Sequence, residues 1–263
     1  MKLKNKVAVI TGGGRGLGRA AALAMAREGA RITIMSRSLS DLNAVRDKIE
    51  AAGGKTLIVE GDVSKEDDVT RLASQTTAHF GGIDILVNNA AVIGPARFLE
   101  DANPGAWEKT IAINLHGAFY CTHTMVPIMT RQGGGKIISI ISGLGQRPYP
   151  RFCAYSVSKA GIIQLTRSLS EELKERNIQV NAIDPGVMDT AMQKEVRALG
   201  AETLGSSVYH NFLENKEKGL LKDPAEVAGL AVFLASPEAD HLTGHYGTLS
   251  DYKRFGWKGA EIL

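Results

Sequence analysis

Short apolar runs alternate with longer amphipathic stretches along almost the whole chain, beginning with the run Lys6–Thr11 and the helical pattern from Gly16 to about Glu28. Apolar runs of this length indicate buried strands, and apolar residues spaced three or four apart indicate helices that bury one face. The further predicted strands are Arg31–Met35, Thr56–Glu60, Ile83–Val87, Lys136–Ile141, Gln179–Ile183 and Tyr246–Leu249. The further predicted helices are Ser40–Ala52, Glu66–Phe80, Ala106–Thr130, Cys153–Lys174 and Pro224–Leu234.

This alternation of strands and helices predicts a parallel sheet of the α/β class. Val7–Ile10 and Ile137–Ile141 are apolar at nearly every position, which suits a sheet covered by helices on both faces. We therefore expect a doubly wound, Rossmann-type parallel sheet of about seven strands. A single domain over residues 1–263 is expected, because no linker, repeat or change of composition divides the chain. Ligands bind such sheets beyond the carboxyl ends of the strands, so the chemistry is expected directly after the apolar runs.

The composition narrows the classes of function. The 263 residues carry a net charge of +3 with scattered basic side chains, which argues against a nucleic-acid partner. The basic start runs directly into a short strand, and no apolar run approaches the length of a membrane span, so neither a signal peptide nor a membrane partner is expected. The two cysteines, Cys121 and Cys153, do not have the spacing of metal ligands, and no metal site is expected. These features fit a protein of the reducing cytoplasm.

A glycine-rich turn follows the first predicted strand and precedes the first helix. It reads Thr11-Gly12-Gly13-Gly14-Arg15-Gly16-Leu17-Gly18. Glycines at this place allow a tight turn and the close approach of backbone N–H groups to a pyrophosphate, which then lies at the positive end of the helix. The turn predicts a dinucleotide site, and a turn that serves packing alone is the alternative.

The end of the second predicted strand bears on which dinucleotide is bound. An acidic residue there would hydrogen-bond a free adenosine ribose and repel a 2′-phosphate. This chain has Ser36 and Arg37 instead, and Arg15 of the glycine turn adds a second positive charge. Because a guanidinium binds phosphate through parallel hydrogen bonds, we expect NADP(H) to be preferred over NAD(H). The alternative is that both arginines are solvated surface residues.

Tyr155 and Lys159 are four residues apart in a predicted helix, and this spacing places their side chains on one face. A free tyrosine titrates near pH 10, but a cation at about 4 Å and an effective dielectric near 20 stabilises the phenolate by roughly 4 kcal/mol, or about three pKa units. We therefore expect Lys159 to bring the pKa of Tyr155 close to neutrality. Such a tyrosine would serve as a general acid or base. The alternative is that a tyrosine and a lysine four residues apart occur by chance, as they do on many exposed helices.

Together these residues resemble the short-chain dehydrogenase/reductase family, in its single-domain form, over nearly the whole chain. The motifs that carry the resemblance are Thr11, Gly12, Gly16 and Gly18; Asp62-Val63; Asn88-Asn89-Ala90; Asn114, Ser142, Tyr155 and Lys159; and Pro185-Gly186 with Thr190. With the arguments above, the resemblance implies cofactor contacts by Gly12, Gly14, Arg15, Gly16, Leu17, Gly18, Ser36, Arg37, Asp62, Val63, Asn89, Ala90, Tyr155, Lys159, Pro185, Gly186, Val187 and Thr190. It implies a catalytic set of Asn114, Ser142, Tyr155 and Lys159.

The chain departs from the family pattern at two places. Ala91 stands where the family usually has the glycine of Asn-Asn-Ala-Gly, which narrows the backbone freedom beside the cofactor. After Gly244 the family commonly continues to a short strand that ends in Asp-Gly-Gly, whereas this chain has a different segment over residues 245–263. In the family this end lies near a tetramer interface and the substrate mouth, so the resemblance leaves the geometry of assembly open.

The resemblance implies transfer of a hydride between nicotinamide and a carbonyl or secondary alcohol. A carbonyl that accepts hydride develops negative charge on oxygen and needs hydrogen-bond donors and a proton. Tyr155 is the expected proton donor, Ser142 the group that holds the carbonyl oxygen, and Lys159 a further ligand of the nicotinamide ribose. Asn114 is expected to disturb a long helix and to hold a water that relays protons towards Lys159. A polar turn for Ser142 and a satisfied core amide for Asn114 are the alternatives.

Substrate contacts are expected from residues 144–152 and from a lid over residues 187–221, which carries several methionines and aromatic residues. Simple core packing is the alternative for the lid. The same catalytic residues would serve a 3-oxoacyl thioester reductase of the acyl-carrier-protein type, and an NADP(H)-binding sensor without turnover is the alternative of another class. By resemblance, Ala106–Thr130 and Cys153–Lys174 pair between subunits of a homotetramer or homodimer. The sequence does not select the substrate or the direction of the reaction.

Overall fold

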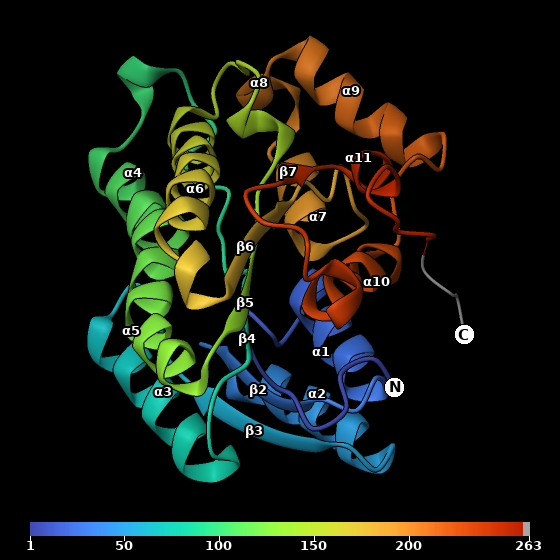
Figure 1. The fold of residues 1–263 in the computed structure, drawn as a ribbon. Helices are drawn as coiled ribbons and strands as arrows, with labels where there is room; N and C mark the ends of the chain where they lie inside the picture. The colour runs from blue at the N-terminus through green and yellow to red at the C-terminus, as the bar shows by residue number, and fades with distance from the viewer. Residues whose placement is uncertain (260–263) are drawn as a thin grey trace.

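Seven parallel strands form the centre of the molecule, which is described here over residues 1–259 by a computed structural model (Figure 1). The strands are β1 Val7–Thr11, β2 Arg31–Ser36, β3 Lys55–Glu60, β4 Ile85–Asn88, β5 Gly135–Ile140, β6 Ile178–Ile183 and β7 Tyr246–Gly247. Their order in the sheet is β3-β2-β1-β4-β5-β6-β7, and all neighbours are parallel. The predicted doubly wound Rossmann-type sheet is confirmed. The last four residues of the expected 1–263 domain lie outside the described residues.

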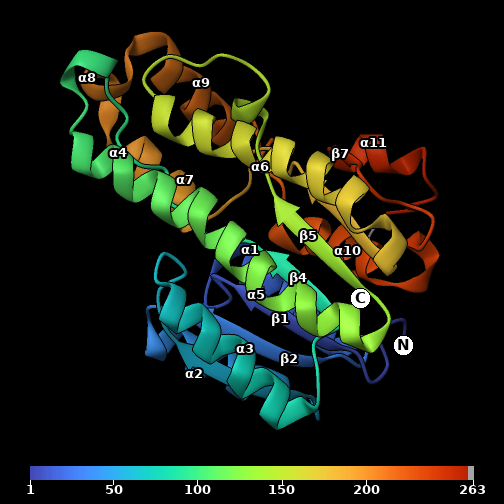
Figure 2. The same cartoon turned by 60° about the vertical axis from the view of Figure 1, so that its left-hand side comes forward.

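Helices cover both faces of the sheet (Figure 2). They are α1 Gly16–Arg27, α2 Leu39–Ala51, α3 Glu66–Phe80, α4 Pro104–Ile111, α5 Gly117–Gln132, α6 Cys153–Glu172, α7 Ala191–Ala198, α8 Gly200–Leu204, α9 Ser206–Glu217, α10 Pro224–Ala235 and α11 Leu249–Lys253. Apolar residues of α1, α2 and α10 pack on one face, and those of α3, α5 and α6 pack on the other. The strands are therefore buried from both sides, as their continuous apolar sequences require.

The chain reverses its direction of winding between β1 and β4. From β1 it runs outward through β2 to β3, and it then crosses back so that β4 pairs with the other edge of β1. At such a point the connections after the two strands diverge and leave a crevice beyond their carboxyl ends. The glycine-rich turn after β1 and the Asn88-Asn89-Ala90 run at the end of β4 lie on the two sides of this crevice.

Two predicted elements differ from the structure in their details. The single helix expected over Ala106–Thr130 is divided into α4 and α5 by a π-helical turn, Ala112–His116. The last strand is only two residues long instead of spanning Tyr246–Leu249, because Thr248 caps α11 and forms reciprocal hydrogen bonds with Asp251. The atypical C-terminal segment thus replaces a longer strand with a short helix.

Candidate functional site

A cavity of about 580 Å³ opens beyond the carboxyl ends of the strands. All of the expected cofactor and catalytic residues line it except Gly18 and Asn114. The expected residues that line it are Gly12, Gly14, Arg15, Gly16, Leu17, Ser36, Arg37, Asp62, Val63, Asn89, Ala90, Ser142, Tyr155, Lys159, Pro185, Gly186, Val187 and Thr190. Segments far apart in the sequence therefore meet at one site.

The glycine-rich turn is packed so closely that side chains are excluded. Gly12 has a φ of +64°, and a Cβ on this residue would lie 3.0 Å from the Cα of Ala90. A Cβ on Gly18 would lie 2.3 Å from the carbonyl oxygen of Gly12. Gly18 thus serves the packing of α1 against the turn instead of lining the cavity. The Asn89 amide holds the turn in place by donating to the carbonyl oxygen of Thr11 at 2.8 Å.

The start of α1 suits an anion. Its N-cap residue, Arg15, makes no side-chain capping hydrogen bond, and both Gly16 and Leu17 line the cavity. The first N–H groups of a helix have no partner within the helix and attract negative charge. Together with the close-packed glycines and the size of the cavity, this start fits the pyrophosphate of a dinucleotide, as the sequence predicts.

The far end of the cavity, at β2 and β3, carries charges of both signs. Arg37 Nη1 lies 4.0 Å from Asp62 Oδ2, and the Arg37 side chain is 54% exposed. Arg15 lies instead near α7, where its Nη2 is 3.6 Å from Glu195 Oε1. Asp41 of α2, which the sequence analysis did not single out, also lines this end. Of the two expected basic residues, Arg37 is therefore the one that remains at the end of β2.

Tyr155 and Lys159 lie on one face of α6, and both are buried. Lys159 Nζ donates to the carbonyl oxygen of Ile140 at 2.6 Å and lies 5.6 Å from the centre of the Tyr155 ring. Burial raises the pKa of Tyr155 to about 12, with a partly opposing effect of the nearby Ser142 hydroxyl. Burial also lowers the pKa of Lys159 to about 8.

The expected fall of the Tyr155 pKa towards neutrality is therefore wrong for the protein by itself. The sequence argument counted the attraction of the ammonium but not the loss of water around the phenol, which disfavours the phenolate. The ammonium is held by a backbone carbonyl, and a negative group, Asp184, adds to the rise of the Tyr155 pKa. Desolvation is the larger effect here.

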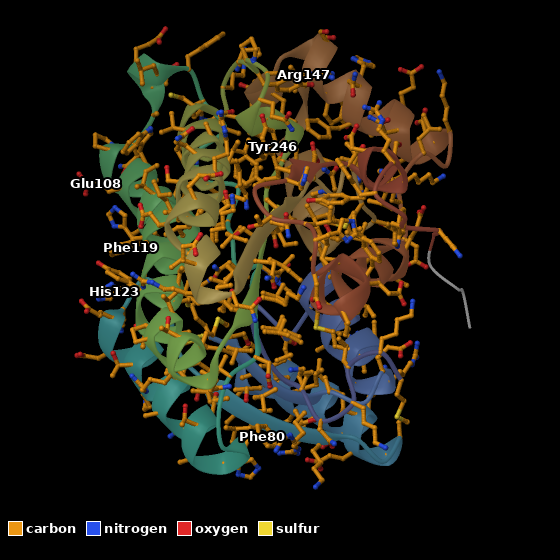
Figure 3. The ribbon with its side chains drawn as sticks, viewed as in Figure 1. Phe80, Glu108, Phe119, His123, Arg147 and Tyr246 are labelled. Atoms are coloured by element: carbon orange, nitrogen blue, oxygen red, sulfur yellow. The ribbon has the colours of Figure 1, made fainter. Side chains whose placement is uncertain are left out.

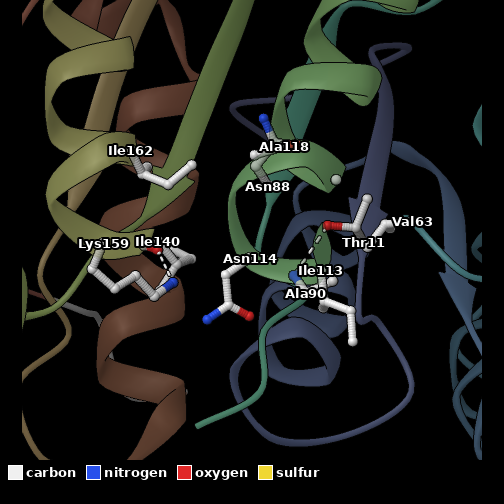
Figure 4. Close-up of a pocket in the computed structure, with 11 residues that line it drawn as sticks. Thr11, Val63, Asn88, Ala90, Ile113, Asn114, Ala118, Ile140, Lys159 and Ile162 are labelled. Atoms are coloured by element: carbon white, nitrogen blue, oxygen red, sulfur yellow. Dashed lines mark hydrogen bonds between the residues drawn. The ribbon is translucent and has the colours of Figure 1, made fainter. Parts of the chain in front are cut away.

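Asn114 is part of the π-helical turn and is buried. Its amide forms two hydrogen bonds with the backbone of Val92, at 2.8 and 2.9 Å, and donates to Ser158 Oγ at 3.0 Å. Asn114 and Lys159 also line a second, small cavity of about 10 Å³, in which the two side chains lie near each other (Figure 4). A cavity of this size is at the lower limit of the space that holds one water molecule. The predicted disturbance of the helix is thus present, and the side chain also has the core contacts of the alternative.

The other end of the large cavity is mostly apolar. It is lined by Val92, Ile93, Leu144, Phe152, Met188, Met192, Val196 and Phe212, and all of these except Val92 and Ile93 come from the two segments expected at the substrate, residues 144–152 and 187–221. Phe152, Val196 and Phe212 pack with Tyr155 in one apolar cluster, so the segment expected as a lid supplies both core and cavity wall. Val92, Ile93 and Asp184 were missed, although an acidic residue directly before Pro185-Gly186 was a visible signal.

The described part of the chain contains neither a cluster of metal ligands nor a helix that could span a membrane. Within residues 1–259, no three His, Cys, Asp or Glu side chains gather as metal ligands would. Among the same residues, none of the helices combines the length and the apolar character needed to cross a bilayer.

Comparison with known proteins agrees with the geometry. The family model described as short chain dehydrogenase matches residues 6–199. The chain is 34% identical to the 3-oxoacyl-[acyl-carrier-protein] reductase of Thermotoga maritima, over 93% of this chain and 96% of that protein. It is 36% identical to the 3-oxoacyl-[acyl-carrier-protein] reductase of Synechocystis, over 92% and 94%. The crystal structure of a levodione reductase is similar with a TM-score of 0.87 and 29% identity, covering 97% of this chain and all of that one.

Proposed function

Since the chain belongs to the short-chain dehydrogenase/reductase family, we propose that it transfers hydride between NADP(H) and a carbonyl or secondary alcohol. One observation carries the proposal. Ser142, Tyr155 and Lys159 line the same cavity as a glycine turn and an uncapped helix start that fit a dinucleotide. The cofactor would supply the hydride, and the residues described above would hold and orient it.

In this proposal the protein acts on the carbonyl oxygen. Ser142 donates a hydrogen bond that orients the carbonyl, and Tyr155 gives a proton to the oxygen as negative charge develops there. A Tyr155 pKa of about 12 keeps the phenol protonated at neutral pH, which suits a proton donor in the direction of reduction. Lys159 stabilises the resulting phenolate. Asn114 and a water in the small cavity would connect Lys159 with further protons.

The preference for NADP(H) is supported by the end of β2. Ser36 and Arg37 line the cavity there, with no acidic residue at either position. The only ion pair of Arg37 among the described residues is the 4.0 Å contact with Asp62, and such an exposed pair is readily exchanged for a phosphate. Asp41 and Asp62 oppose the preference by their charge, so Arg37 is the residue on which it depends.

Replacement of the phenol tests the reaction. In Tyr155→Phe we expect the rate of ketone reduction with NADPH to fall by about 10²- to 10⁴-fold, the usual effect of removing a general acid. Tyr120→Phe is the matched control, because Tyr120 is a partly buried tyrosine of α5 that does not line the cavity. Near-native turnover in Tyr155→Phe would show that another group gives the proton.

A second candidate is reduction of 3-oxoacyl thioesters, because the two curated relatives above carry that name. The apolar cavity end would then hold the acyl chain. Comparing acetoacetyl thioesters with aromatic ketones and sugars, each with NADPH and NADH, distinguishes the two candidates. Binding of NADPH without its oxidation by any of these compounds would instead support a sensor without turnover.

We also propose that the protein assembles through α5 and α6 as a homotetramer or homodimer in the cytoplasm. The two helices lie side by side on one flank of the molecule (Figure 1). Phe119 of α5 is 48% exposed and Val157 of α6 is 45% exposed, and Phe119 stacks on His123. Phe119 and His123 point away from the sheet (Figure 3). Sedimentation of Phe119→Asp against the wild type tests the assembly, and unchanged oligomers would exclude this face.

A further inference from the structure

Asp184 is a buried carboxylate at the reacting end of the cavity. It directly follows β6, only 6% of it is exposed, and it lines the cavity beside Ser142 and Tyr155. The family motif that begins at Pro185 does not include it. A buried carboxylate is costly unless its oxygens receive hydrogen bonds or a cation. Its partners are therefore informative.

The carboxylate has fewer partners than its oxygens can accept. Oδ1 accepts from the backbone N–H of Gly186 at 3.0 Å, and Oδ2 accepts from Gln146 Nε2 at the long distance of 3.4 Å. A carboxylate has about four acceptor positions. Within residues 1–259, Asp184 forms no ion pair. Each oxygen thus has an acceptor position left, and Oδ2 is the one whose existing hydrogen bond is longer.

Oδ2 lies next to the place that a substrate carbonyl would take. A Cβ on Gly143, the residue after Ser142, would be in contact with Oδ2 at 3.4 Å, so the absence of a side chain at Gly143 leaves this oxygen uncovered. The Asp184 charge also raises the pKa of both Tyr155 and Lys159, which places it near the proton donor. A carbonyl oxygen between Ser142 and Tyr155 would hold its neighbouring carbon within reach of Oδ2.

The remaining wall of this end is mostly apolar. Leu144, Phe152, Met192, Val196 and Phe212 line it, together with the uncharged amide of Gln193. Such a wall suits an uncharged ring or chain and offers no charged group to bind a charged tail. A charged acceptor at the reacting end of a mostly apolar pocket favours substrates with a donor close to the carbonyl.

We propose that Asp184 accepts a hydrogen bond from the substrate, and that the substrate is an apolar carbonyl compound with a hydroxyl or protonated amine on the carbon next to the carbonyl. This inference rests on the proposed function for the position of the carbonyl. A substrate without the donor would leave the buried carboxylate unpaired, and sites of this kind discriminate strongly. Asp184 is then a specificity-determining residue that Gln146 helps to orient.

Four aryl ketones test the inference: acetophenone, phenacyl alcohol, the methyl ether of phenacyl alcohol, and phenacylamine. The ether keeps the electron-withdrawing oxygen but lacks the donor. We expect wild-type kcat/KM to be about 10- to 150-fold higher for phenacyl alcohol than for the ether, the usual effect of a hydrogen bond to a charged group. In Asp184→Ala and Asp184→Asn this ratio should fall close to one. Phenacylamine shows whether the preferred donor is an ammonium.

Asp67→Asn is the control, since Asp67 is an exposed aspartate of α3 and does not line the cavity. Its ratio of kcat/KM for phenacyl alcohol to that for the ether should equal the wild-type ratio. Equal rates for alcohol and ether in the wild type would overturn the inference and leave the proposed reaction intact.

Binding of both ketones to enzyme saturated with oxidised cofactor, measured by calorimetry, gives an answer that does not need turnover. The inference is supported if phenacyl alcohol binds more tightly than the ether and if Asp184→Asn abolishes this difference. This holds even if no ketone is reduced, and in that case only the proposed reaction fails. Equal binding of the two ketones overturns the inference.

Discussion

Arg37 allows the preference for NADP(H) to be tested with one change of charge. Its Nη1 lies 4.0 Å from Asp62 Oδ2, and its side chain is 54% exposed. An ion pair this exposed contributes at most about 1 kcal/mol, so turning Arg37 towards a phosphate costs little. A hydrogen bond from the guanidinium to phosphate is worth about 1.5 to 3 kcal/mol, which corresponds to about 10- to 150-fold in kcat/KM. The proposed preference requires that the guanidinium–phosphate hydrogen bond contribute at least the lower of these two values, about tenfold in kcat/KM.

In Arg37→Asp the contact is lost and the new carboxylate repels the 2′-phosphate. At an exposed site this repulsion adds about 1 kcal/mol, or roughly another fivefold. The ratio of kcat/KM for NADPH to that for NADH should therefore fall about 50- to 750-fold, mostly through the value for NADPH. The assay follows oxidation of each cofactor with one saturating ketone, and higher ionic strength should reduce the wild-type preference.

Lys48→Asp is the control for the change of net charge, because Lys48 is exposed on the neighbouring helix α2 and does not line the cavity. In Lys48→Asp the ratio of kcat/KM for NADPH to that for NADH should match the wild-type ratio. A wild type without preference for NADPH, or an unchanged ratio in Arg37→Asp, would refute the reasoning.

Two further predictions concern the lysine and the C-terminal segment. Burial lowers the pKa of Lys159 to about 8, so the ammonium that supports the phenolate is lost as the pH rises. The rate of ketone reduction should therefore decline above about pH 8. Lys159→Met should reduce ketones more slowly and lack this limb of the pH–rate profile, and an unshifted profile would exclude the electrostatic role of Lys159. The Tyr252 hydroxyl donates to the carbonyl oxygens of Ala182 at 2.8 Å and His245 at 3.0 Å, so Tyr252→Phe should lower the free energy of unfolding by about 1 to 3 kcal/mol in chemical denaturation. Tyr246→Phe, at an exposed position, should change it little, and equal losses in the two variants would contradict the assigned contact.

The cofactor end of the site could be predicted from the sequence because its determinants are local. A glycine-rich turn between an apolar strand and a helix typically binds a dinucleotide. Gly12 and Gly16 both have a positive φ, a conformation that favours glycine in any turn of this kind. The strand order β3-β2-β1-β4 then brings this turn against Asn89 and Ala90. The alternation of strands and helices predicted the doubly wound sheet, and the resemblance to a family added Asn89 and Ala90 to the expected cofactor site.

The segments at the substrate end were expected, but the contacts between their side chains could not be predicted in the same way. Nothing in the spacing of Phe152, Val196 and Phe212 shows that they meet. A disturbed helix was expected at Asn114, but the hydrogen bonds of its amide with the backbone of Val92, 22 residues away, were not. The pKa of Tyr155 depends on burial, and burial is a property of the packed structure. Local patterns thus predicted which groups are present, and the tertiary contacts determined their properties.

The balance around Tyr155 determines the protonation states in which the reacting end would meet a carbonyl. Burial shifts its pKa from 10.0 to about 12, which corresponds to about 3 kcal/mol against the phenolate. A cation at about 4 Å could return a similar amount, roughly 4 kcal/mol at an effective dielectric near 20, so the place of the Lys159 ammonium decides which effect wins. Asp184 raises the pKa of both groups and thereby favours a neutral phenol and a charged lysine. Both states are those that a proton donor needs before the transfer, so the carboxylate proposed to select the substrate would also hold the site ready to reduce it.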